Sequence, residues 1–176
     1  MSGQKRKSQE QKLIPIFKNL KEMNISISEA TITKEDAKIV MEWRNNSETL
    51  KMFYNQKVKT WDTFWKEYSD EYFKSINLTP CFALLEGRKI AFLRSLKYDI
   101  PELSGISFDI DINVSPDMRG KGIGTSVIKV FCNQIFSNGV DHVIAEVKKI
   151  NLASARAFEK SDFVLFDVLN LSDMMD

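Results

Sequence analysis

Cysteine and histidine are scarce in this chain, and their scarcity limits the chemistry open to it. The two cysteines, Cys81 and Cys132, lie in apolar surroundings and are too few and too far apart for a disulfide framework or a zinc site. We therefore predict that both are packing residues and that no metal is bound. The single histidine, His142, stands at the start of a predicted strand and is interpreted as structural rather than catalytic.

The chain also lacks an excess of charge of either sign and any long apolar run. Its formal net charge of +1 gives no electrostatic argument for a nucleic-acid or anionic-membrane partner. No uninterrupted apolar stretch approaches the roughly 18 residues that span a bilayer, and the N-terminus has no apolar core of the kind found in signal peptides. We therefore expect a cytoplasmic protein that binds neither nucleic acid nor membrane.

Length and composition favour one folded domain. With 176 residues, of which 43% are hydrophobic, the chain can bury one ordinary core but not two. Residues 1–11 contain no apolar side chain after Met1 and are predicted to form a disordered tail. Residues 12–176 are predicted to form the domain, with a short helix over 13–23 that packs on it from outside.

The most informative stretch is a glycine-dense turn between a strand and a helix. Residues 106–114 alternate apolar with polar side chains, as a strand with two different faces does. Residues 123–135 repeat apolar side chains at every fourth position, which is typical of an amphipathic helix. At Gly120, Gly122 and Gly124 no side chain shields the backbone, and a helix N-terminus presents unpaired N–H groups. The turn is therefore predicted to bind phosphate.

Spacing excludes two common phosphate-binding loops. A P-loop needs a lysine before its final Ser or Thr, but glycine precedes Thr125, and a dinucleotide fingerprint needs glycine at Thr125 or Val127. The pattern Arg119-x-x-Gly122-x-Gly124 after a strand resembles the coenzyme A pyrophosphate loop of the GCN5-related N-acetyltransferase (GNAT) superfamily. The alternative is a turn that only joins strand to helix, in which three glycines would merely weaken the helix.

The predicted order of elements supports this resemblance over residues 25–170. It implies an α/β (α+β) three-layer fold with a central mixed, mostly antiparallel sheet, flanking helices, and a parallel strand pair around the glycine turn. A loop through residues 54–56 is predicted to lead to Thr60, and Thr33 and Thr60 are predicted to precede helices. Residues 86–89 are predicted to form a short hairpin turn, and the aromatic stripe over 61–73 is interpreted as core packing, with a substrate pocket as the alternative for part of it. The predicted strands are 25–32, 81–85, 90–96, 106–114, 143–147 and 163–169, and the predicted helices are 34–45, 61–73, 123–137 and 151–160.

A second motif, near the C-terminus, both matches the family and departs from it. Asn151-x-x-Ser154, followed by Phe158, is similar to a later motif of the superfamily that ends in Gly-Phe. The family often has a tyrosine at the aromatic position, whose hydroxyl protonates the leaving thiolate; Phe158 has no such proton, which leaves Ser154 or water as the donor. Asp162 replaces the usual glycine, which is tolerable because Asp enters the left-handed region more readily than most residues.

The resemblance implies that an amine attacks acetyl-CoA directly, without a metal. The pantetheine arm would lie along the end of strand 106–114, with a backbone N–H near Val114 facing the thioester carbonyl. Asn151 would contact the pantetheine or cap its own helix, and one side chain could not easily do both. The implied cofactor-binding residues are Ile112, Val114, Met118, Arg119, Gly120, Lys121, Gly122, Ile123, Gly124, Thr125, Asn151 and Phe158.

Two carboxylates on one face of the strand are the candidate catalytic groups. Asp109 and Asp111 are separated by a two-residue rise, about 7 Å. Because buried carboxylates are costly, this face either meets solvent or lines a wet groove. In the groove, one of them would be the general base, acting directly or through water, with Glu146 on the neighbouring strand in reserve.

The acceptor is predicted from a shorter resemblance. Trp43-Arg44-Asn45, together with Tyr54, looks most like the branch of nucleotide-linked amino-sugar and ribosomal-protein N-acetyltransferases. The favoured acceptor is an amino group on a nucleotide-linked amino sugar, and the four residues named are the candidate substrate contacts. A protein N-terminus or a polyamine is the alternative acceptor, and a non-catalytic coenzyme A-binding module is the alternative function.

Assembly is predicted from the short C-terminus. After the strand over 163–169 too little chain remains for the usual seventh strand, which would leave an open sheet edge. Exposed edges invite pairing and are normally covered. We expect either residues 13–23 or a second subunit, in a homodimer, to cover this edge.

Overall fold

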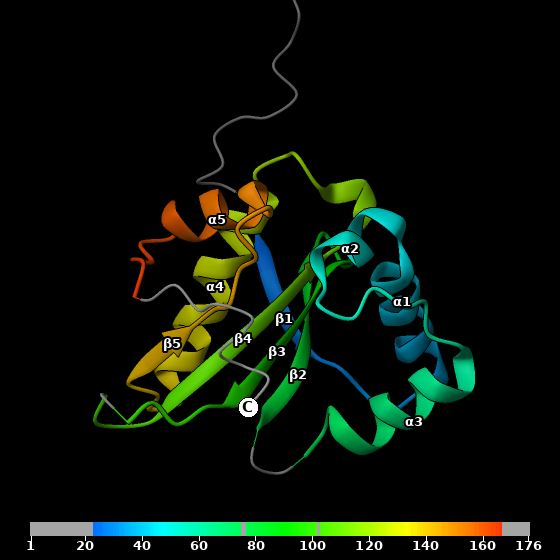
Figure 1. The fold of residues 1–176 in the computed structure, drawn as a ribbon, viewed down its shortest axis with the longest axis horizontal. Helices are drawn as coiled ribbons and strands as arrows, with labels where there is room; N and C mark the ends of the chain where they lie inside the picture. The colour runs from blue at the N-terminus through cyan, green and yellow to red at the C-terminus, as the bar shows by residue number, and fades with distance from the viewer. Residues whose placement is uncertain (1–22, 75–76, 102, 167–176) are drawn as a thin grey trace, which may run out of the picture.

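Five strands form one sheet with helices on both faces in the computed structural model, which describes residues 23–74, 77–101 and 103–166 (Figure 1). The strands are β1 Ile25–Glu29, β2 Leu78–Leu85, β3 Arg88–Lys97, β4 Ser107–Val114 and β5 His142–Ile144. They lie side by side in chain order, and every pairing is antiparallel except the parallel β4–β5 pair. The helices are α1 Lys34–Asn45, α2 Ser47–Met52, α3 Trp61–Glu71, α4 Ile123–Ser137 and α5 Leu152–Glu159, with a 3-10 turn, η2 Pro116–Met118, after β4. This confirms the predicted mixed, mostly antiparallel sheet.

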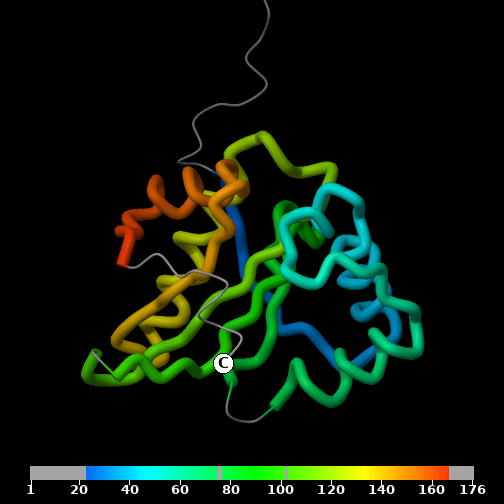
Figure 2. The backbone as a smooth tube through the Cα atoms, viewed as in Figure 1, coloured from blue at the N-terminus to red at the C-terminus, as the bar shows by residue number. Residues whose placement is uncertain are grey.

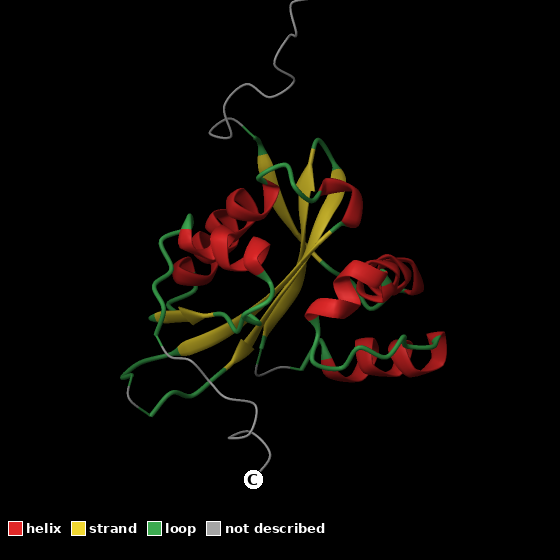
Figure 3. Cartoon of the chain, turned by 45° about the horizontal axis from the view of Figure 1, so that its top comes forward, coloured by secondary structure: helices red, strands yellow, loops and turns green. Residues whose placement is uncertain are grey.

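Each face of the sheet carries its own hydrophobic layer. On one face α1 and α3 cover Phe82 and Phe92, whose ring centroids lie 5.2 Å apart. On the other face α4 and α5 cover the apolar side of the sheet, with Val127 of α4 fully buried. Figure 3 shows these helices on either side of the twisted sheet. Phe64 and Tyr68 of α3 are also fully buried, so the aromatic stripe is largely core, as predicted.

Local chemistry explains several element boundaries. The side chain of Thr33 accepts a hydrogen bond from the N–H of Asp36 and so caps α1, as predicted. Glu86 and Gly87 both have positive φ and form the tight turn of the predicted β2–β3 hairpin. Thr60 precedes α3 as predicted, although its side chain makes no capping hydrogen bond.

No helix was predicted between Asn45 and the loop through residues 54–56, but the structure has α2 there. Asn46 accepts hydrogen bonds from the N–H groups of Glu48 and Thr49 through its Oδ1 atom, and this cap starts the helix. The six residues of α2 are too few to show a helical period in sequence. The cap residue was therefore the only sequence signal for this helix.

The pairing between β4 and β5 is short. Their register ends with Asp109 opposite Ile144, while β4 continues to Val114. The strand predicted over 143–147 is therefore too long, because the residues after Ile144 leave the sheet. Figure 2 shows the chain beyond β5 turning toward α5 while β4 runs on. Along residues 110–114, the edge of β4 that faced β5 has no strand partner among the described residues.

The C-terminal segment differs from the prediction. Residues 163–166 are not part of a strand, so the strand predicted over 163–169 is wrong where the structure describes it. Its last residues, and the predicted helix over 13–23 apart from its final residue, lie outside the described residues. Covering of the sheet edge, and with it the homodimer, stays a prediction. Within the described ranges, no helix has the length and apolar character needed to cross a membrane.

The cysteines and the histidine occupy the structural positions expected of them. Cys81 and Cys132 are buried and free, and burial raises the pKa of each thiol to about 11. Neither thiol therefore ionises near neutral pH. The Nε2 atom of His142 lies 2.9 Å from the carbonyl oxygen of Ser104, at the start of β5.

Candidate active site

The glycine turn after β4 leaves its backbone N–H groups free. Gly120 and Gly122 have φ values of +72° and +76°, in the left-handed region that residues with a side chain rarely adopt. Gly122 directly precedes α4, so the turn runs into a helix N-terminus. No backbone acceptor in the described part of the chain pairs with the N–H groups of residues 119–124. Together with the positive end of the helix dipole, these donors suit an anion such as a diphosphate.

Side chains next to the turn anchor it to the core. Met118 packs against the core, and Ile123 is 2% exposed, so both predicted cofactor residues offer backbone rather than side chain to a ligand. A β-carbon at Gly124 would lie 3.7 Å from that of Ala157, so this glycine faces α5 closely. Lys121 is exposed, and its ammonium donates to a carbonyl of η2.

Arg119 turns its side chain away from the free N–H groups. Its guanidinium donates to the carbonyl oxygen of Val114 at 3.0 Å, to Oγ1 of Thr49 at 2.6 Å and to Oδ1 of Asn113 at 3.2 Å. Burial lowers the pKa of Arg119. The side chain ties the turn to β4 and α2, so a phosphate at the turn would meet the backbone of Arg119 rather than its guanidinium.

The last residues of β4 have two N–H groups on the edge that is no longer paired with β5. Opposite residues of an antiparallel pair alternate between exchanging both hydrogen bonds and exchanging none. The N–H of Ser115 donates to Ile90, so the adjacent pair of Ala91 and Val114 is of the kind that exchanges none. The N–H groups of Val114 and Ile112 therefore point away from β3. An extended ligand could pair with this edge of β4.

The acidic groups of β4 lie on the face that α3 covers. Asp111 stands opposite Arg94 of β3, and their side chains pair with Nη2 of Arg94 2.7 Å from Oδ2 of Asp111. The guanidinium also lies 4.0 Å above the ring of Tyr72. Burial would lower the pKa of Arg94, but the adjacent carboxylate of Asp111 raises it above its ordinary value. Asp111 is thus held in a fixed ion pair.

Asp109 lacks such a partner. Its Oδ1 atom is buried and makes no hydrogen bond within the described residues. Burial, with the carboxyl groups of Glu146 and Asp111 adding to it, raises the pKa of Asp109 to about 7. Glu146 is exposed and lies two residues beyond the end of β5. The structure therefore brings the three predicted carboxyl groups together where β4 and β5 separate.

The second motif is arranged on α5. Oδ1 of Asn151 accepts a hydrogen bond from the N–H of Ser154 at 3.2 Å, so the capping alternative is the one observed. Phe158 packs edge-on against Phe163, with ring centroids 4.9 Å apart. Asp162 has a φ of +68°, which confirms the left-handed position expected where the family has glycine. Separately, the Oγ of the serine at position 161 donates to the carbonyl oxygen of Thr125, which ties α5 to α4.

Three of the four predicted substrate contacts make contacts within the fold, and their contact with a substrate stays a prediction. The ring of Trp43 packs edge-on against a core phenylalanine, at 6.2 Å between centroids. Arg44 is 7% exposed and donates to the carbonyl oxygen of Lys57 at 2.9 Å. Asn45 exchanges two hydrogen bonds with the backbone of Lys59. These side chains hold the loop after α2 in place.

The fourth, Tyr54, lies beside residues that the sequence analysis missed. Its side chain is 56% exposed, and Nζ of Lys148 sits 5.0 Å from its ring centroid. Arg94 and Tyr72 were missed as well. An arginine inside an apolar strand was a readable signal for Arg94, whereas nothing in the sequence places Lys148 against a loop that lies far away along the chain.

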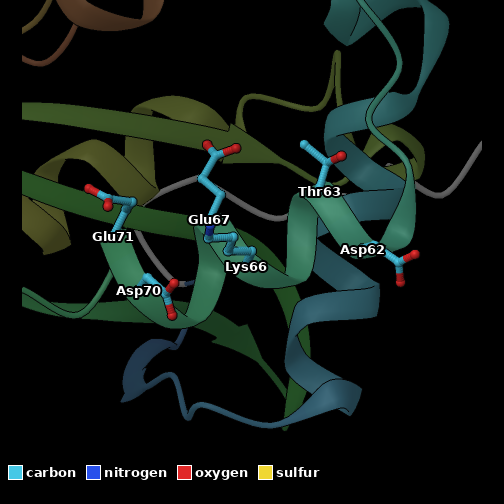
Figure 4. A pocket seen from close by; sticks show the side chains of 6 residues that line it. All are labelled: Asp62, Thr63, Lys66, Glu67, Asp70 and Glu71. Atoms are coloured by element: carbon cyan, nitrogen blue, oxygen red, sulfur yellow. The ribbon is translucent and has the colours of Figure 1, made fainter.

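Two hollows of about 490 Å³ each lie on the surface of the described residues. One is lined by polar side chains of α3, which Figure 4 shows along the helix. No predicted site residue lines it, although one lining residue, Glu67, accepts a hydrogen bond from the hydroxyl of Tyr72 at 3.4 Å. The other adjoins Trp43, Ser115 and Asp117, next to the start of the glycine turn.

Comparisons with known proteins agree with this geometry. The family model described as an acetyltransferase (GNAT) domain matches residues 30–164. No curated protein matches in sequence. The chain is similar to a structure of the aminoglycoside acetyltransferase AAC(6')-Ib in complex with coenzyme A, with a TM-score of 0.67, 21% identity, and 80% and 84% of the two chains covered.

Two further solved structures have the same fold. A spermidine N-acetyltransferase from Vibrio cholerae, in complex with CoA and spermine, gives a TM-score of 0.67 at 13% identity, covering 80% of each chain. A domain from Methanocaldococcus jannaschii gives a TM-score of 0.66 at 21% identity, covering 80% of this chain and 88% of that one. At such identities the likeness establishes the fold and nothing finer.

Proposed function

The chain belongs to the GNAT acetyltransferase family and is an N-acetyltransferase, and we propose that it transfers the acetyl group of acetyl-CoA to a primary amine of a small, positively charged molecule. One observation carries the proposal: the free N–H groups of residues 119–124 adjoin the open edge of β4, and Asp109 stands where that edge begins. The groups that would bind a diphosphate, bind an extended arm and accept a proton therefore follow one another along the end of β4 and the glycine turn.

The described residues fit acetyl-CoA. The N–H groups of residues 119–124 would hold the pyrophosphate, and the edge of β4 at Ile112 would hold the pantetheine arm. When bound, acetyl-CoA supplies an acyl group activated as a thioester. The N–H of Val114 would stabilise the negative charge that develops on the acyl oxygen. Asn151 uses its oxygen as a helix cap, which leaves its NH₂ group for the arm.

The chain's own residues must move two protons as the N–C bond forms and the C–S bond breaks. Asp109, with an unpartnered Oδ1 and a pKa of about 7, accepts the proton of the attacking amine directly or through a water. Asp111, paired with Arg94, contributes a fixed negative charge, and Glu146 is the reserve base. Phe158 cannot give a proton to the leaving thiolate, so Ser154 or water does.

The charges on the acidic face favour a cationic acceptor. Neither Asp109 nor Glu146 forms an ion pair within the described residues, so an ammonium group would be attracted to them. The sequence favoured an amino group on a nucleotide-linked sugar, through Arg44 and Asn45. Because both of these side chains are engaged by the loop after α2, they offer less support to a nucleotide than the carboxyl groups offer to an amine with several charges.

The test is calorimetry with acetyl-CoA, followed by thiol release in the presence of an amine panel. We expect acetyl-CoA to bind and spermidine to support faster thiol release than nucleotide-linked amino sugars or peptide N-termini. If amino-sugar nucleotides are the better substrates, the sequence-based acceptor replaces ours. Acetylation of peptides alone would overturn both small-molecule acceptors.

A second function, a non-catalytic coenzyme A-binding module, rests on Phe158. Its ring packs against Phe163 and offers no proton to a thiolate. Tight acetyl-CoA binding without thiol release for any amine in the panel would establish this module in place of the transferase.

A further inference from the structure

Two cationic side chains hold the short segment 46–54, which comprises the Asn46 cap, α2, Phe53 and Tyr54 and is here called the wall segment. One is Arg119, in the glycine turn. The other is Lys148, which follows β5. The wall segment belongs to the side of the sheet that carries α1 and α3, the same side as the acidic face of β4 (Figure 1). It therefore borders the acceptor side of the site.

Arg119 reaches the wall segment from the cofactor side. Its Nη2 atom donates to Oγ1 of Thr49 at 2.6 Å, and its Nη1 atom lies 3.5 Å from Oδ1 of Asn46, the cap of α2. The same guanidinium holds the carbonyl oxygen of Val114, whose N–H faces the open edge of β4. One side chain thus connects the cofactor turn, the end of β4 and the start of α2.

Lys148 reaches the wall segment from the other side of the open edge. Its Nζ atom donates to the carbonyl oxygen of Phe53 at 2.6 Å and lies over the ring of Tyr54. No carboxylate in the described ranges pairs with Lys148. Its charge is therefore directed to the last residues of the wall segment.

Few other contacts hold the wall segment: the Cζ atom of Arg44 lies 5.5 Å from the ring centroid of Phe53, and Nε2 of Gln56 donates to the carbonyl oxygen of Lys51 at 3.4 Å. α2 has six residues, of which only Thr49 and Leu50 are buried. A helix of this length is not stable alone in water, and a segment with few buried apolar contacts opens locally at low cost. Its position is therefore set by polar contacts at its two ends.

We propose that Arg119 and Lys148 are positioning residues that clasp the wall segment, Arg119 from the cofactor side and Lys148 from the other side of the open edge, so that filling the glycine turn orders the acceptor side of the site. The inference rests on the proposed binding of acetyl-CoA at residues 119–124. A ligand on the N–H groups of that range fixes the backbone of Arg119 and, through its guanidinium, α2.

The experiment measures backbone hydrogen exchange of residues 46–54 in the full chain, with and without coenzyme A. Thr49→Val removes the acceptor for Arg119, and Lys148→Met removes the ammonium while keeping most of the side-chain length. Thr49→Ser and Lys148→Arg keep the polar groups and test for rescue. Lys149→Met is the matched control, because Lys149 is exposed and makes none of these contacts.

Without coenzyme A, we expect exchange of the wall segment to be about 10-fold faster in Lys148→Met and Thr49→Val than in Lys149→Met. Because the ligand acts through Arg119, coenzyme A should slow this exchange about 10-fold in the wild type, in the two conservative variants and in Lys148→Met, but by less than about 2-fold in Thr49→Val. Calorimetry should show the same coenzyme A affinity in all of them.

Two results would overturn the proposal that Arg119 and Lys148 position the wall segment. One is exchange of the wall segment in Lys148→Met that equals that of Lys149→Met, which would mean that Lys148 holds nothing. The other is a loss of coenzyme A affinity in Thr49→Val and Lys148→Met as large as the change in exchange, which would make the two cations part of the cofactor site. The comparison without ligand does not depend on cofactor binding, so failure of the wild type to bind coenzyme A would overturn the proposed function separately.

Discussion

The two halves of the proposed site are made of different parts of the chain. The proposed cofactor half consists of backbone groups: the N–H groups of residues 119–124 and the open edge of β4 at Ile112 and Val114. The proposed acceptor half consists of side chains from β3, β4 and the segment after β5, with Asp109, Asp111 and Arg94 at its centre. Backbone geometry is set by local sequence, whereas the side-chain cluster depends on which strands become neighbours.

This difference decides how each half responds to change. In the backbone half, only residues that alter φ or add a β-carbon disturb the site, so most side chains there are replaceable. In the side-chain half, each charge affects the pKa of its neighbours, so a single substitution changes several groups at once. The predictions below test this contrast.

The largest effect is expected at Gly122. A valine there must adopt a left-handed φ of +76° and places a branched side chain beside the free N–H groups. We expect Gly122→Val to weaken acetyl-CoA binding by more than about 100-fold, as measured by calorimetry. The matched control is Gly139→Val, at the far end of α4, where φ is +80° and an added β-carbon meets nothing within 4 Å.

Both valine variants should lose stability, by roughly 1–2 kcal/mol, because both force a β-branched residue into the left-handed region. Only the variant in the turn should lose binding. If Gly122→Val and Gly139→Val bind acetyl-CoA equally well, the turn is a connector and the cofactor half lies elsewhere.

Most of the fold and the cofactor half were readable in the sequence, because their signals are local. The alternation over 106–114, the glycines of the turn and the left-handed Asp162 each depend on a few consecutive residues. The extent of β5 was not readable, since Ala145, Glu146 and Val147 continue an apolar-polar alternation after the chain has left the sheet at Ile144. The partners of Arg94 and Lys148 could not be predicted either, because both contacts join segments that are far apart in the chain.

The second prediction addresses the side-chain half. Asp109→Asn removes the proposed proton acceptor while keeping its shape, and kcat with spermidine should fall about 100-fold with acetyl-CoA affinity unchanged. In the wild type, the rate should rise with pH through about 7 as Asp109 ionises, and the variant should lack this step. A retained step would assign the base to Glu146 instead.

The same group links stability to pH. Its folded pKa of about 7 lies above the ordinary value of 3.8, so the folded state holds a proton that the unfolded state releases. The stabilisation is present below about pH 4 and is lost as the pH rises through 7. After allowance for solvent screening, Asp109→Asn should be more stable than wild type by roughly 1–3 kcal/mol at pH 8, as measured by urea unfolding. At pH 4, where Asp109 is protonated in the wild type, this advantage of the variant should be lost.

The third prediction separates substrate contact from structure at Arg44. Because its guanidinium is buried and donates to Asn45 and to the backbone of Lys57, Arg44→Met should lower the free energy of unfolding by about 2–3 kcal/mol. Lys34→Met, on the exposed side of α1, should change it by less than about 0.5 kcal/mol. A changed preference between spermidine and amino-sugar nucleotides, without loss of stability, would restore Arg44 as a substrate contact.

The smallest effect is expected where a side chain occupies a backbone position suited to glycine. Asp162 has a φ of +68° and Glu86 one of +51°, the two positive values among described residues other than glycine. Glycine relieves the strain of the left-handed region but adds freedom to the unfolded chain, so each replacement should stabilise by only about 0.5 kcal/mol. Asp162→Gly and Glu86→Gly should raise the urea midpoint alike and leave acetyl-CoA affinity unchanged. If Asp162→Gly alone destabilises, the carboxylate of Asp162 must hold the turn after α5 through contacts worth more than the strain, and this position belongs to the side-chain half.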